Sequence, residues 1–432
     1  MSRSDAGTER NILVVLHPDR PLVLDPIEVF ANDPPPGWPE LLGEVRQAVP
    51  AGAWPLGPGR EVPGLRIHVA VARGTATAAD RRWTRHLDRQ WPQAVHQVVA
   101  AAWDEDADRA LPHPRRAPWM RRGWWTEVSA WVDARLAEVG QRKTGDLEPK
   151  EHWGISAVAL VPTSGGSMWL KAVPPIFARE PAVLRLLDER LPGRVPAVVA
   201  ADATAVETRV LLTEAGPVPA EVNAHDLPRL AALLADVQVR SLDLLPRLAA
   251  AGCADHSPTQ LAAELARMAE EGVELDRLDP QERAALQRLV PELTNRLLAL
   301  SVGPLPTVLV HGDFHPWNVA RPPSWKDSDA VIIDWTDAGI GPAGVDLATL
   351  FPETADEAAR REVRRAYADV FATHLGIPLS VADAAVEATE VAGHVIQALA
   401  YDVILRGIEP AAAGLLSGAM AGRLRALLAM TN

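Results

Sequence analysis

The sequence predicts an α+β protein with more than one domain, and three observations support that fold class. Short β-like runs and one long helical stretch precede a proline-rich segment near residue 115. Several strand-like segments follow between residues 150 and 216. Beyond residue 217 the chain is rich in Ala and Leu with helical periodicity, interrupted by one β-like island at 307–335. A length of 432 residues fits two to three such domains.

Composition and charge narrow the class of protein. Hydrophobic residues make up 48% and charged residues 23%, which is typical of a globular chain that buries large cores. No apolar run is long enough to predict a membrane span. The single cysteine, Cys253, favours a reducing compartment and a cytoplasmic location. The net charge is −13 and acidic residues dominate the C-terminal half, so we expect no nucleic-acid partner there, whereas a cationic ligand would be attracted.

Residues 1–112 are expected to form an N-terminal α+β accessory domain. Strands are predicted at 11–17, 21–24 and 65–73, a loop at 33–39 and a helix at 79–105. The layout resembles a small Nudix-like domain, but the arginine and paired glutamates of a Nudix box are absent. A structural or substrate-capping role is therefore expected for this domain, rather than hydrolysis.

Residues 113–140 are expected to be a linker followed by a docking helix. Three prolines within 111–118 predict the linker. One face of the following helix carries Trp124, Val128, Trp131, Val132 and Leu136. Tryptophans beside arginines are also compatible with a membrane-surface or RNA-binding helix. Docking of the first domain onto the second is favoured, because the arginines are few and the surrounding sequence is not basic.

The strongest chemical signal is the β-like island. An apolar strand runs into His311-Gly312-Asp313-Phe314-His315-Pro316-Trp317-Asn318, and a second apolar strand runs into Asp334. Carboxylates just beyond buried strands are held rigidly. Phosphoryl transfer requires one carboxylate to orient the acceptor hydroxyl, and it requires further oxygen ligands for Mg²⁺. Asp313, Asn318 and Asp334 supply that set.

These motifs, followed by GPAGVDLATL, closely resemble the aminoglycoside phosphotransferase and choline kinase-like family. The resemblance implies a protein-kinase-like two-lobed fold, with a small β-rich N-lobe at 141–216 and a larger helical C-lobe at 217–432. It implies that Asp313 is catalytic, that Asn318 and Asp334 bind Mg²⁺, and that His311 and Asp346 brace the catalytic loop.

The resemblance also implies a nucleotide site upstream. Lys171, one of only four lysines, ends a predicted strand, and Glu180 begins the next predicted helix. The two are expected to pair and to hold the phosphates of ATP or GTP. Gly154 and Ser156 lie where the family has a degenerate phosphate-covering loop. The backbone of Thr213 and Ala215 is expected to bind the purine.

A polar stripe near the C-terminus is a candidate wall of the acceptor site. Its members recur at helical spacing and are expected to share one face of a single helix: Glu387, Glu390, His394, Gln397 and Tyr401. The stripe is equally compatible with a solvated face. If it lines the acceptor site, the two glutamates favour a cationic acceptor.

The leading hypothesis is a Mg²⁺-dependent O-phosphotransferase that uses a nucleoside triphosphate to phosphorylate a hydroxylated, antibiotic-like or amino-sugar-like small molecule, as an antibiotic-resistance enzyme does. One alternative is a metabolic kinase of a sugar, amino sugar or choline-like alcohol. Another is a nucleotide-binding pseudokinase with a regulatory role. The sequence is silent on the oligomeric state.

Overall fold

The computed structural model describes residues 10–16, 23–24, 26–29, 38–49, 52–56, 60–62, 65–73, 83–84, 87, 89–106 and 113–430. The chain divides into two compact units, which are described separately. Unit 1 comprises Met1–Pro175, Val199–Leu212 and Gly407–Leu415, and unit 2 comprises Ile176–Val198, Thr213–Arg406 and Leu416–Asn432. In the part of the chain that is described, no helix is long and apolar enough to cross a membrane.

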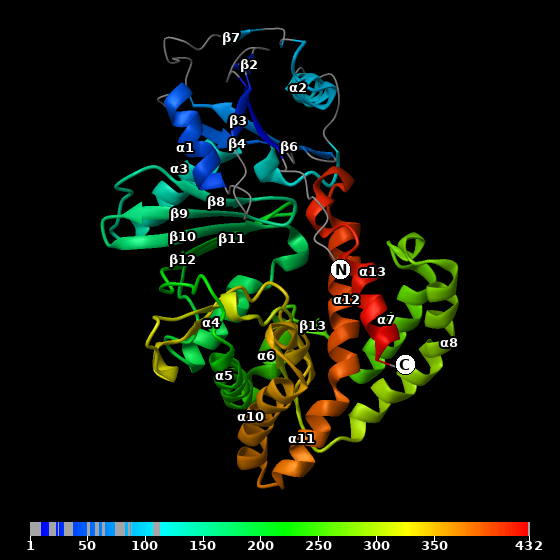
Figure 1. Ribbon diagram of the computed structural model, residues 1–432. Coiled ribbons are helices and arrows are strands. Elements are labelled where there is room, and N and C mark those ends of the chain that lie inside the picture. Colours follow the sequence, from blue (N-terminus) through cyan, green and yellow to red (C-terminus); the bar gives the residue numbers. More distant parts are fainter. Residues whose placement is uncertain are drawn as a thin grey trace. The chain divides into compact units, whose positions relative to one another are not determined.

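The N-terminal part of unit 1 is a mixed sheet whose two faces carry different helices (Figure 1). In its centre β1 (Arg10–Leu16) runs parallel to β6 (Leu65–Ala72). The other strands are β2 (Val23–Leu24), β3 (Ile27–Val29), β4 (Ala53–Pro55), β5 (Arg60–Val62) and β7 (Trp83–Thr84). Alternate β1 side chains point to opposite faces. Leu13 and Val15 therefore pack with α1 (Trp38–Ala48), whereas Ile12 and Val14 pack with α2 (Gln93–Asp106).

Two expectations for this region were wrong. Residues 38–39 were assigned to a loop but open α1, a helix that the sequence pattern did not predict. The long helix expected at 79–105 is confined to α2, and β7 lies where its first turns were placed. The rest of the expected 33–39 loop lies outside the described residues.

The second part of unit 1 is a five-stranded sheet covered by the tryptophan-rich helix. The strand order is β11-β12-β10-β9-β8. The strands are β8 (Glu148–His152), β9 (Ala157–Thr163), β10 (Gly166–Val173), β11 (Val198–Ala203) and β12 (Thr208–Thr213). Helix α3 (Trp124–Glu138) buries the face that includes Trp125, Val128 and Val132 against alternate residues of β9 and β10. Trp54 of β4 stacks on Trp125 of α3 with ring centroids 5.5 Å apart.

Unit 2 is mainly helical. Its helices are α4 (Glu180–Arg190), α5 (Leu227–Arg240), α6 (Leu245–Ala250), α7 (Pro258–Glu271), α8 (Pro280–Ala299), α9 (Leu347–Leu350), α10 (Glu357–Leu375), α11 (Leu379–Ala388), α12 (Glu390–Gly407) and α13 (Ala419–Ala429). Helices α7, α8, α12 and α13 share one apolar core (Figure 1). Asp279 caps α8 through a reciprocal bond with Glu282, and Pro280 occupies the first turn, where its missing N–H costs nothing.

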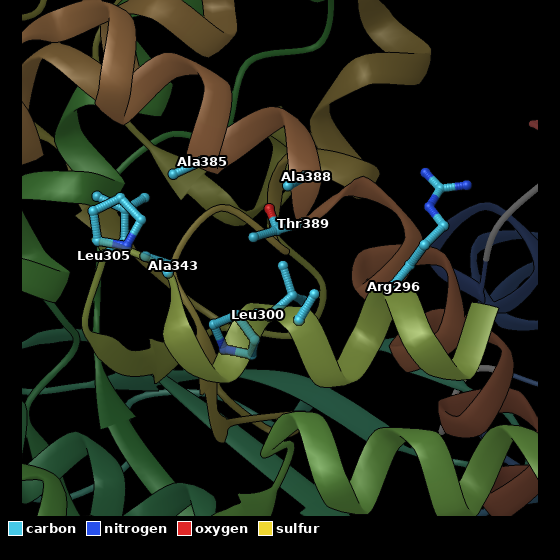
Figure 2. Close-up of a pocket in the computed structure, with 11 residues that line it drawn as sticks. Arg296, Leu300, Leu305, Ala343, Ala385, Ala388 and Thr389 are labelled. Carbon is cyan, nitrogen blue, oxygen red and sulfur yellow. The ribbon is translucent and has the colours of Figure 1, made fainter. Parts of the chain in front are cut away.

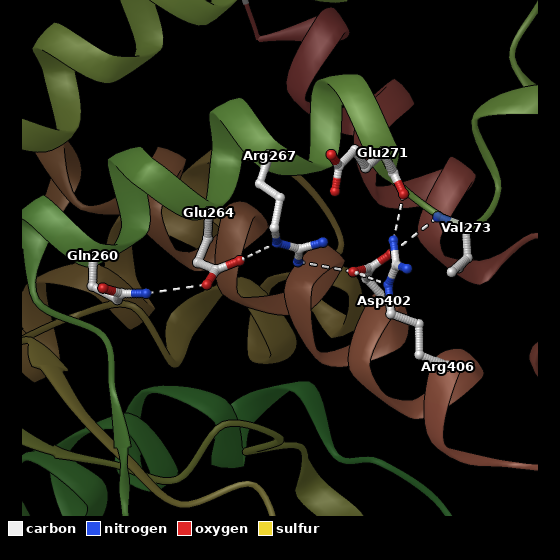
Figure 3. A network of polar contacts seen from close by, with 7 residues as sticks. All are labelled: Gln260, Glu264, Arg267, Glu271, Val273, Asp402 and Arg406. Carbon is white, nitrogen blue, oxygen red and sulfur yellow. Dashed lines mark hydrogen bonds and ion pairs between the residues drawn. The ribbon is translucent and has the colours of Figure 1, made fainter.

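A buried charge network joins α7 to α12 (Figure 3). The fully buried Asp402 carboxylate accepts hydrogen bonds from Arg267 Nη2 at 2.9 Å, Val273 N at 3.0 Å and Arg406 Nε at 3.0 Å. Burial opposes ionisation, but these donors outweigh it and hold the pKa of Asp402 below its usual value. The network fixes α12 against α7.

Two short sheets in unit 2 bring two chain segments together. β14 (Thr307–Val310) pairs with β17 (Gly339–Pro342), which also pairs with β13 (Ala254–Asp255). β15 (Val319–Ala320) pairs with β16 (Val331–Ile332). The loop 311–318 joins β14 to β15, and the loop 333–338 joins β16 to β17. The two pairings therefore place these loops side by side.

Candidate functional site

Asp346 holds the candidate catalytic loop, residues 311–318, in place through hydrogen bonds. The buried Asp346 carboxylate accepts hydrogen bonds from His311 N at 3.1 Å and from Gly312 N at 2.8 Å. Gln238 Nε2 also donates to it, at 3.0 Å. Burial raises the pKa of Asp346 to about 6, although the two amides and Gln238 favour the carboxylate. Asp346 thus accepts two hydrogen bonds from the loop and one from α5.

His311 joins the two loops. Its fully buried ring places Nε2 3.0 Å from Ile333 O and Nδ1 3.3 Å from Asp313 N. These partners select the tautomer in which Nε2 donates and Nδ1 accepts. Burial lowers the pKa of His311, so the imidazole is neutral and acts as a brace.

Asp313 and Asn318 lie at opposite ends of the same turn. Asn318 Nδ2 donates to the main-chain oxygen of Asp313 at 2.9 Å, which directs Oδ1 of the amide elsewhere. The Asp313 carboxylate is 44% exposed and lies 3.5 Å from His315 Nε2. Burial disfavours a charged His315, but Asp313, Asp334 and Glu353 outweigh burial and raise the pKa of His315.

Asp334 is brought to this turn by the second loop. Ile333 N donates to Asn318 O at 2.9 Å, which places Asp334 directly after the contact. Asp334 has a φ of 63°, the only positive φ among described residues other than glycine. Thr336 Oγ1 donates to Asp334 Oδ1 at 2.5 Å. A strained backbone held by neighbouring bonds is typical of a functional position.

The donor set suits a magnesium ion. Asn318 and Asp334 offer an amide and a carboxylate oxygen, which are ligands that Mg²⁺ prefers. Among the residues described, no group of three or more His, Cys, Asp or Glu could hold a metal ion. In proteins Mg²⁺ is usually bound by one or two carboxylates, with water and substrate oxygens completing its coordination.

Several supporting residues were not predicted from the sequence. Gln238 also donates to Leu309 O at 2.9 Å, and Tyr367 Oη donates to Gln238 Oε1 at 2.5 Å. Thr349 Oγ1 donates to Phe314 O at 2.7 Å. The sequence did contain a signal for Gln238, because it lies on the apolar face of a helix and a buried amide requires polar partners.

Lys171 and Glu180 belong to different units. Lys171 is 9% exposed near the end of β10 in unit 1. Glu180 opens α4 in unit 2, is 1% exposed, and accepts a hydrogen bond from Trp335 N at 3.2 Å. Glu180 is thus tied to the residue that follows Asp334. The pairing of Lys171 with Glu180 stays a prediction.

The turn that contains Gly154 and Ser156 is closely packed. Trp153 Nε1 donates to Ser156 Oγ at 2.6 Å, and Trp119 Nε1 donates to Trp153 O at 2.7 Å. A Cβ on Gly154 would lie 2.9 Å from Ala412 Cβ and 3.0 Å from Ala412 O. This glycine is therefore needed for contact with the 407–415 segment, a role that its place in the sequence did not reveal.

One of the main-chain groups expected to bind the purine already has a partner within the protein. Thr213 N donates to Ala197 O at 3.0 Å, and Thr213 Oγ1 accepts from Ala197 N at 2.9 Å. The amide of Thr213 is thus already used within the protein. Ala215 lies in the irregular segment that follows β12.

The five candidate acceptor residues do not form one wall. The single helix expected for them ends at Thr389, whose hydroxyl donates to Val386 O at 2.7 Å, so Glu387 lies on α11 and the others lie on α12. Glu387 pairs with Arg364 of α10 at 3.1 Å, and Glu390 pairs with Arg360. Gln397 is buried, and its Nε2 donates to Gly312 O.

His394 and Tyr401 lie on α12 together with Glu390 and Gln397. Burial lowers the pKa of His394, and Tyr401 packs against the apolar core of the helices. Of the five residues, Glu387 and Glu390 thus form ion pairs, Tyr401 packs on the core and Gln397 supports the catalytic loop.

Comparison with known proteins agrees with these observations. The model of the phosphotransferase enzyme family matches residues 153–378, just over half of the chain. No curated protein sequence matches the chain.

Three solved structures are similar to this chain. The GDP complex of wild-type aminoglycoside 2'-phosphotransferase-IIIa is 17% identical with a TM-score of 0.50, over 71% of this chain and 99% of that one. Choline kinase from Cryptosporidium parvum is 14% identical with a TM-score of 0.48, over 73% and 92%. An aminoglycoside phosphotransferase from Streptomyces rimosus, solved with ADP and streptomycin, is 22% identical with a TM-score of 0.40, over 62% and 98%. The first likeness and the family match confirm the protein-kinase-like fold.

Proposed function

The chain belongs to the phosphotransferase enzyme family, and from that premise we propose that it is a small-molecule kinase that transfers the γ-phosphoryl group of ATP or GTP to an acceptor hydroxyl. The observation that supports this most is the joined pair of loops. They bring Asp334 of the second loop beside the turn that carries Asp313 and Asn318, and Asp346 and His311 hold that turn in place.

Asp313 is the proposed orienter and base. The acceptor oxygen forms a bond to the γ-phosphorus, the bond from that phosphorus to the nucleoside diphosphate breaks, and the acceptor proton passes to the Asp313 carboxylate. Its 44% exposure leaves this carboxylate accessible to an acceptor, and His315 Nε2 lies 3.5 Å from it. Mg²⁺, when bound by Asn318 and Asp334, neutralises phosphate charge.

The nucleotide is proposed to contact Lys171, Glu180 through its pairing with Lys171, the turn at Gly154 and Ser156, and the main chain at Thr213 and Ala215. Because the Thr213 amide is already used, its carbonyl is the group we assign to the purine. The GDP complex of the relative with the same fold supports a nucleoside triphosphate as donor. The acceptor is a hydroxylated small molecule of the kind that antibiotic-modifying or metabolic kinases use.

Replacing Asp313 tests the assignment. Asp313→Ala should lower turnover by about 10²–10⁴-fold, because the hydroxyl loses its orienting base, while nucleotide affinity stays nearly unchanged. Asp334→Asn should weaken binding of the magnesium–nucleotide complex as well. Diphosphate release with a panel of alcohols measures turnover, and calorimetry measures nucleotide binding. Asp276→Asn, at an exposed site remote in sequence from the loops, is the control.

One result would contradict this role. If Asp313→Ala kept more than about a tenth of wild-type turnover, less than ~1.4 kcal/mol of the barrier would depend on the carboxylate. Absence of transfer to every alcohol, together with normal nucleotide binding, would favour the pseudokinase alternative.

A further inference from the structure

The loop 333–338, which carries Asp334, depends on hydrogen bonds for its conformation. The positive φ of Asp334, 63°, is unfavourable for a residue with a side chain, so its neighbours must hold it. Ile333, directly before it, is held by the catalytic loop: its N donates to Asn318 O at 2.9 Å, and its O accepts from His311 Nε2 at 3.0 Å. The residues directly after Asp334 are held by a different element.

The start of α4 holds the two residues that follow Asp334. Trp335 N donates to Glu180 Oε1 at 3.2 Å, and Thr336 O accepts from Arg179 Nη1 at 2.6 Å. Arg179 and Glu180 are the N-cap and the first residue of α4. Two consecutive residues of the helix start thus bind two consecutive residues of the loop. The sequence motifs did not indicate Arg179.

The Arg179 guanidinium is itself fixed in place. Its Nε donates to Gly252 O at 3.0 Å and its Nη2 donates to Ile176 O at 2.8 Å, so all three of its nitrogens have a carbonyl partner. Gly252 lies just before β13, which pairs with β17 beyond the loop. A planar fork with three fixed partners has one orientation, and a lysine, with a single nitrogen, does not reproduce it.

Thr336 connects Arg179 to the carboxylate that we assign to the metal. Its main-chain oxygen accepts from Arg179, and its Oγ1 donates to Asp334 Oδ1 at 2.5 Å. Thr336 is 7% exposed, so both bonds are largely shielded from water. Holding the main chain of Thr336 therefore also holds the hydroxyl that orients the Asp334 carboxylate.

We propose, building on the kinase function above, that Arg179 is a positioning residue for the metal site: through Thr336 it keeps the Asp334 carboxylate in the orientation that Mg²⁺ requires. Mg²⁺ demands near-ideal octahedral geometry, so a ligand that turns freely binds it less well. Loss of such a supporting contact typically lowers metal affinity by about 10–100-fold. The direction of the change is informative, because removing a positive charge would by Coulomb attraction alone strengthen the binding of a cation.

Hydrogen exchange of the metal-free full chain tests whether Arg179 holds the loop. Arg179→Gln should raise the exchange rate of peptides that cover residues 333–338 about tenfold or more, because the loop opens more often, and should leave α7 unchanged. Arg296→Gln is the matched control. This exposed arginine of α8 lines a cavity of about 360 Å³ between α8 and α11, and no residue of either loop lines that cavity (Figure 2). Equal exchange of the loop in the two variants would overturn the inference.

Binding of Mn²⁺ in the presence of ADP, followed by electron paramagnetic resonance, tests the metal site without turnover. Mn²⁺ takes the same oxygen ligands as Mg²⁺. Arg179→Gln should weaken Mn²⁺ binding about tenfold or more. Arg179→Lys keeps the charge but not the three hydrogen bonds, so it should weaken binding to a similar extent. Wild-type affinity in either variant would contradict the inference.

Thr336→Val tests the same connection if Arg179→Gln fails to fold. The substitution keeps the shape and the main-chain oxygen of residue 336 and removes the bond to Asp334. It should weaken Mn²⁺ binding by a similar factor. Unchanged Mn²⁺ affinity in this variant would refute the connection through Thr336, and with it the inference.

Failure of the inference and failure of the proposed function give different results. Wild-type Mn²⁺ affinity in the Arg179 variants, together with Asp313-dependent phosphorylation, would refute the inference and leave the kinase function standing. Absence of Asp313-dependent transfer to any acceptor would refute the proposed function, and the exchange and Mn²⁺ measurements would still decide the role of Arg179.

Discussion

Among single residues, two with unusual backbone conformations set the geometry of the catalytic loop. Gly312 has a φ of 88°, and a Cβ at this position would lie 2.5 Å from Asp337 O. Asp334 adopts a φ of 63° although it is not a glycine. This backbone conformation costs free energy, which the surrounding hydrogen bonds must offset. Gly312 is in close contact with Asp337 and so joins the two loops. A side chain here would collide with Asp337 and would also strain the positive φ.

Gly312→Ala should therefore destabilise the protein by about 1–3 kcal/mol, because alanine is strained at positive φ and its methyl group meets a main-chain oxygen. Turnover should fall as well, since the loop must shift. Gly422→Ala is the control: this glycine lies inside α13, no atom lies within 4 Å of the position that a methyl group would take, and the change should stabilise by about 0.5–1 kcal/mol. Urea unfolding of both variants measures the difference, and equal effects would refute the steric argument.

Among the elements, the segment Gly407–Leu415 is a strap that belongs to unit 1 although α12 and α13 on either side lie mostly or wholly in unit 2. Glu409 of the strap forms a buried pair with Arg116 of the linker, at 2.9 Å to Nε and 2.7 Å to Nη2. Ala412 fills the space that Gly154 leaves. The strap thus supports the turn that we assign to the nucleotide phosphates.

Glu409→Gln should lower the free energy of unfolding by up to about 3 kcal/mol, because it removes the negative charge that pairs with the buried Arg116 guanidinium. It should raise the KM of the nucleotide more than it lowers kcat, since the Trp153–Ser156 turn loses its support. The double variant Arg116→Met with Glu409→Met should recover much of the stability. Glu189→Gln, in the exposed pair with Arg247, should change neither the stability nor the KM and is the control.

In the molecule as a whole, the N-terminal sheet has its own hydrophobic cores, which involve α1 and α2 and lie within residues 12–99. It also contacts the rest of unit 1. Arg73 at the end of β6 forms a bidentate pair with Asp146, at 2.7 and 2.9 Å, and its guanidinium lies 4.5 Å from the Trp54 ring centroid. A domain boundary near residue 112 therefore stays a prediction, with the accessory domain docked through Trp54 and Trp125.

Limited proteolysis tests that boundary. The first cuts should fall near Pro112–Ala117 or at Pro34–Pro36, of which residues 34–36 and 112 lie outside the described part of the chain. Within the linker, Arg115 is exposed whereas Arg116 and Ala117 are buried, so trypsin should cleave after Arg115. Mass spectrometry of the earliest fragments identifies the sites. First cleavage inside residues 150–220 would count against a boundary at 112.

The family, the α+β class and the residues of the catalytic turn follow from the amino-acid sequence without any structure. Asp313 and Asn318 are five residues apart on one loop, and Asp334 directly follows an apolar strand, so local spacing and strand pairing are enough to predict their proximity. The strands at 11–17 and 65–73 were also predictable, because period-two hydrophobicity is a local signal. The helix at 38–48 was missed because its proline and glycine content resembles a loop.

The roles of the more distant residues required the folded chain. Glu387 and Glu390 looked like an acidic wall until α10 placed Arg364 and Arg360 against them. Gln397 reaches a carbonyl 85 positions earlier, and Gly154 packs against Ala412 near the other end of the chain. The two glutamates, Gln397 and Gly154 share one physical reason. A side chain's charge, exposure and partners depend on which remote element packs against it, and helical periodicity carries no information about that partner.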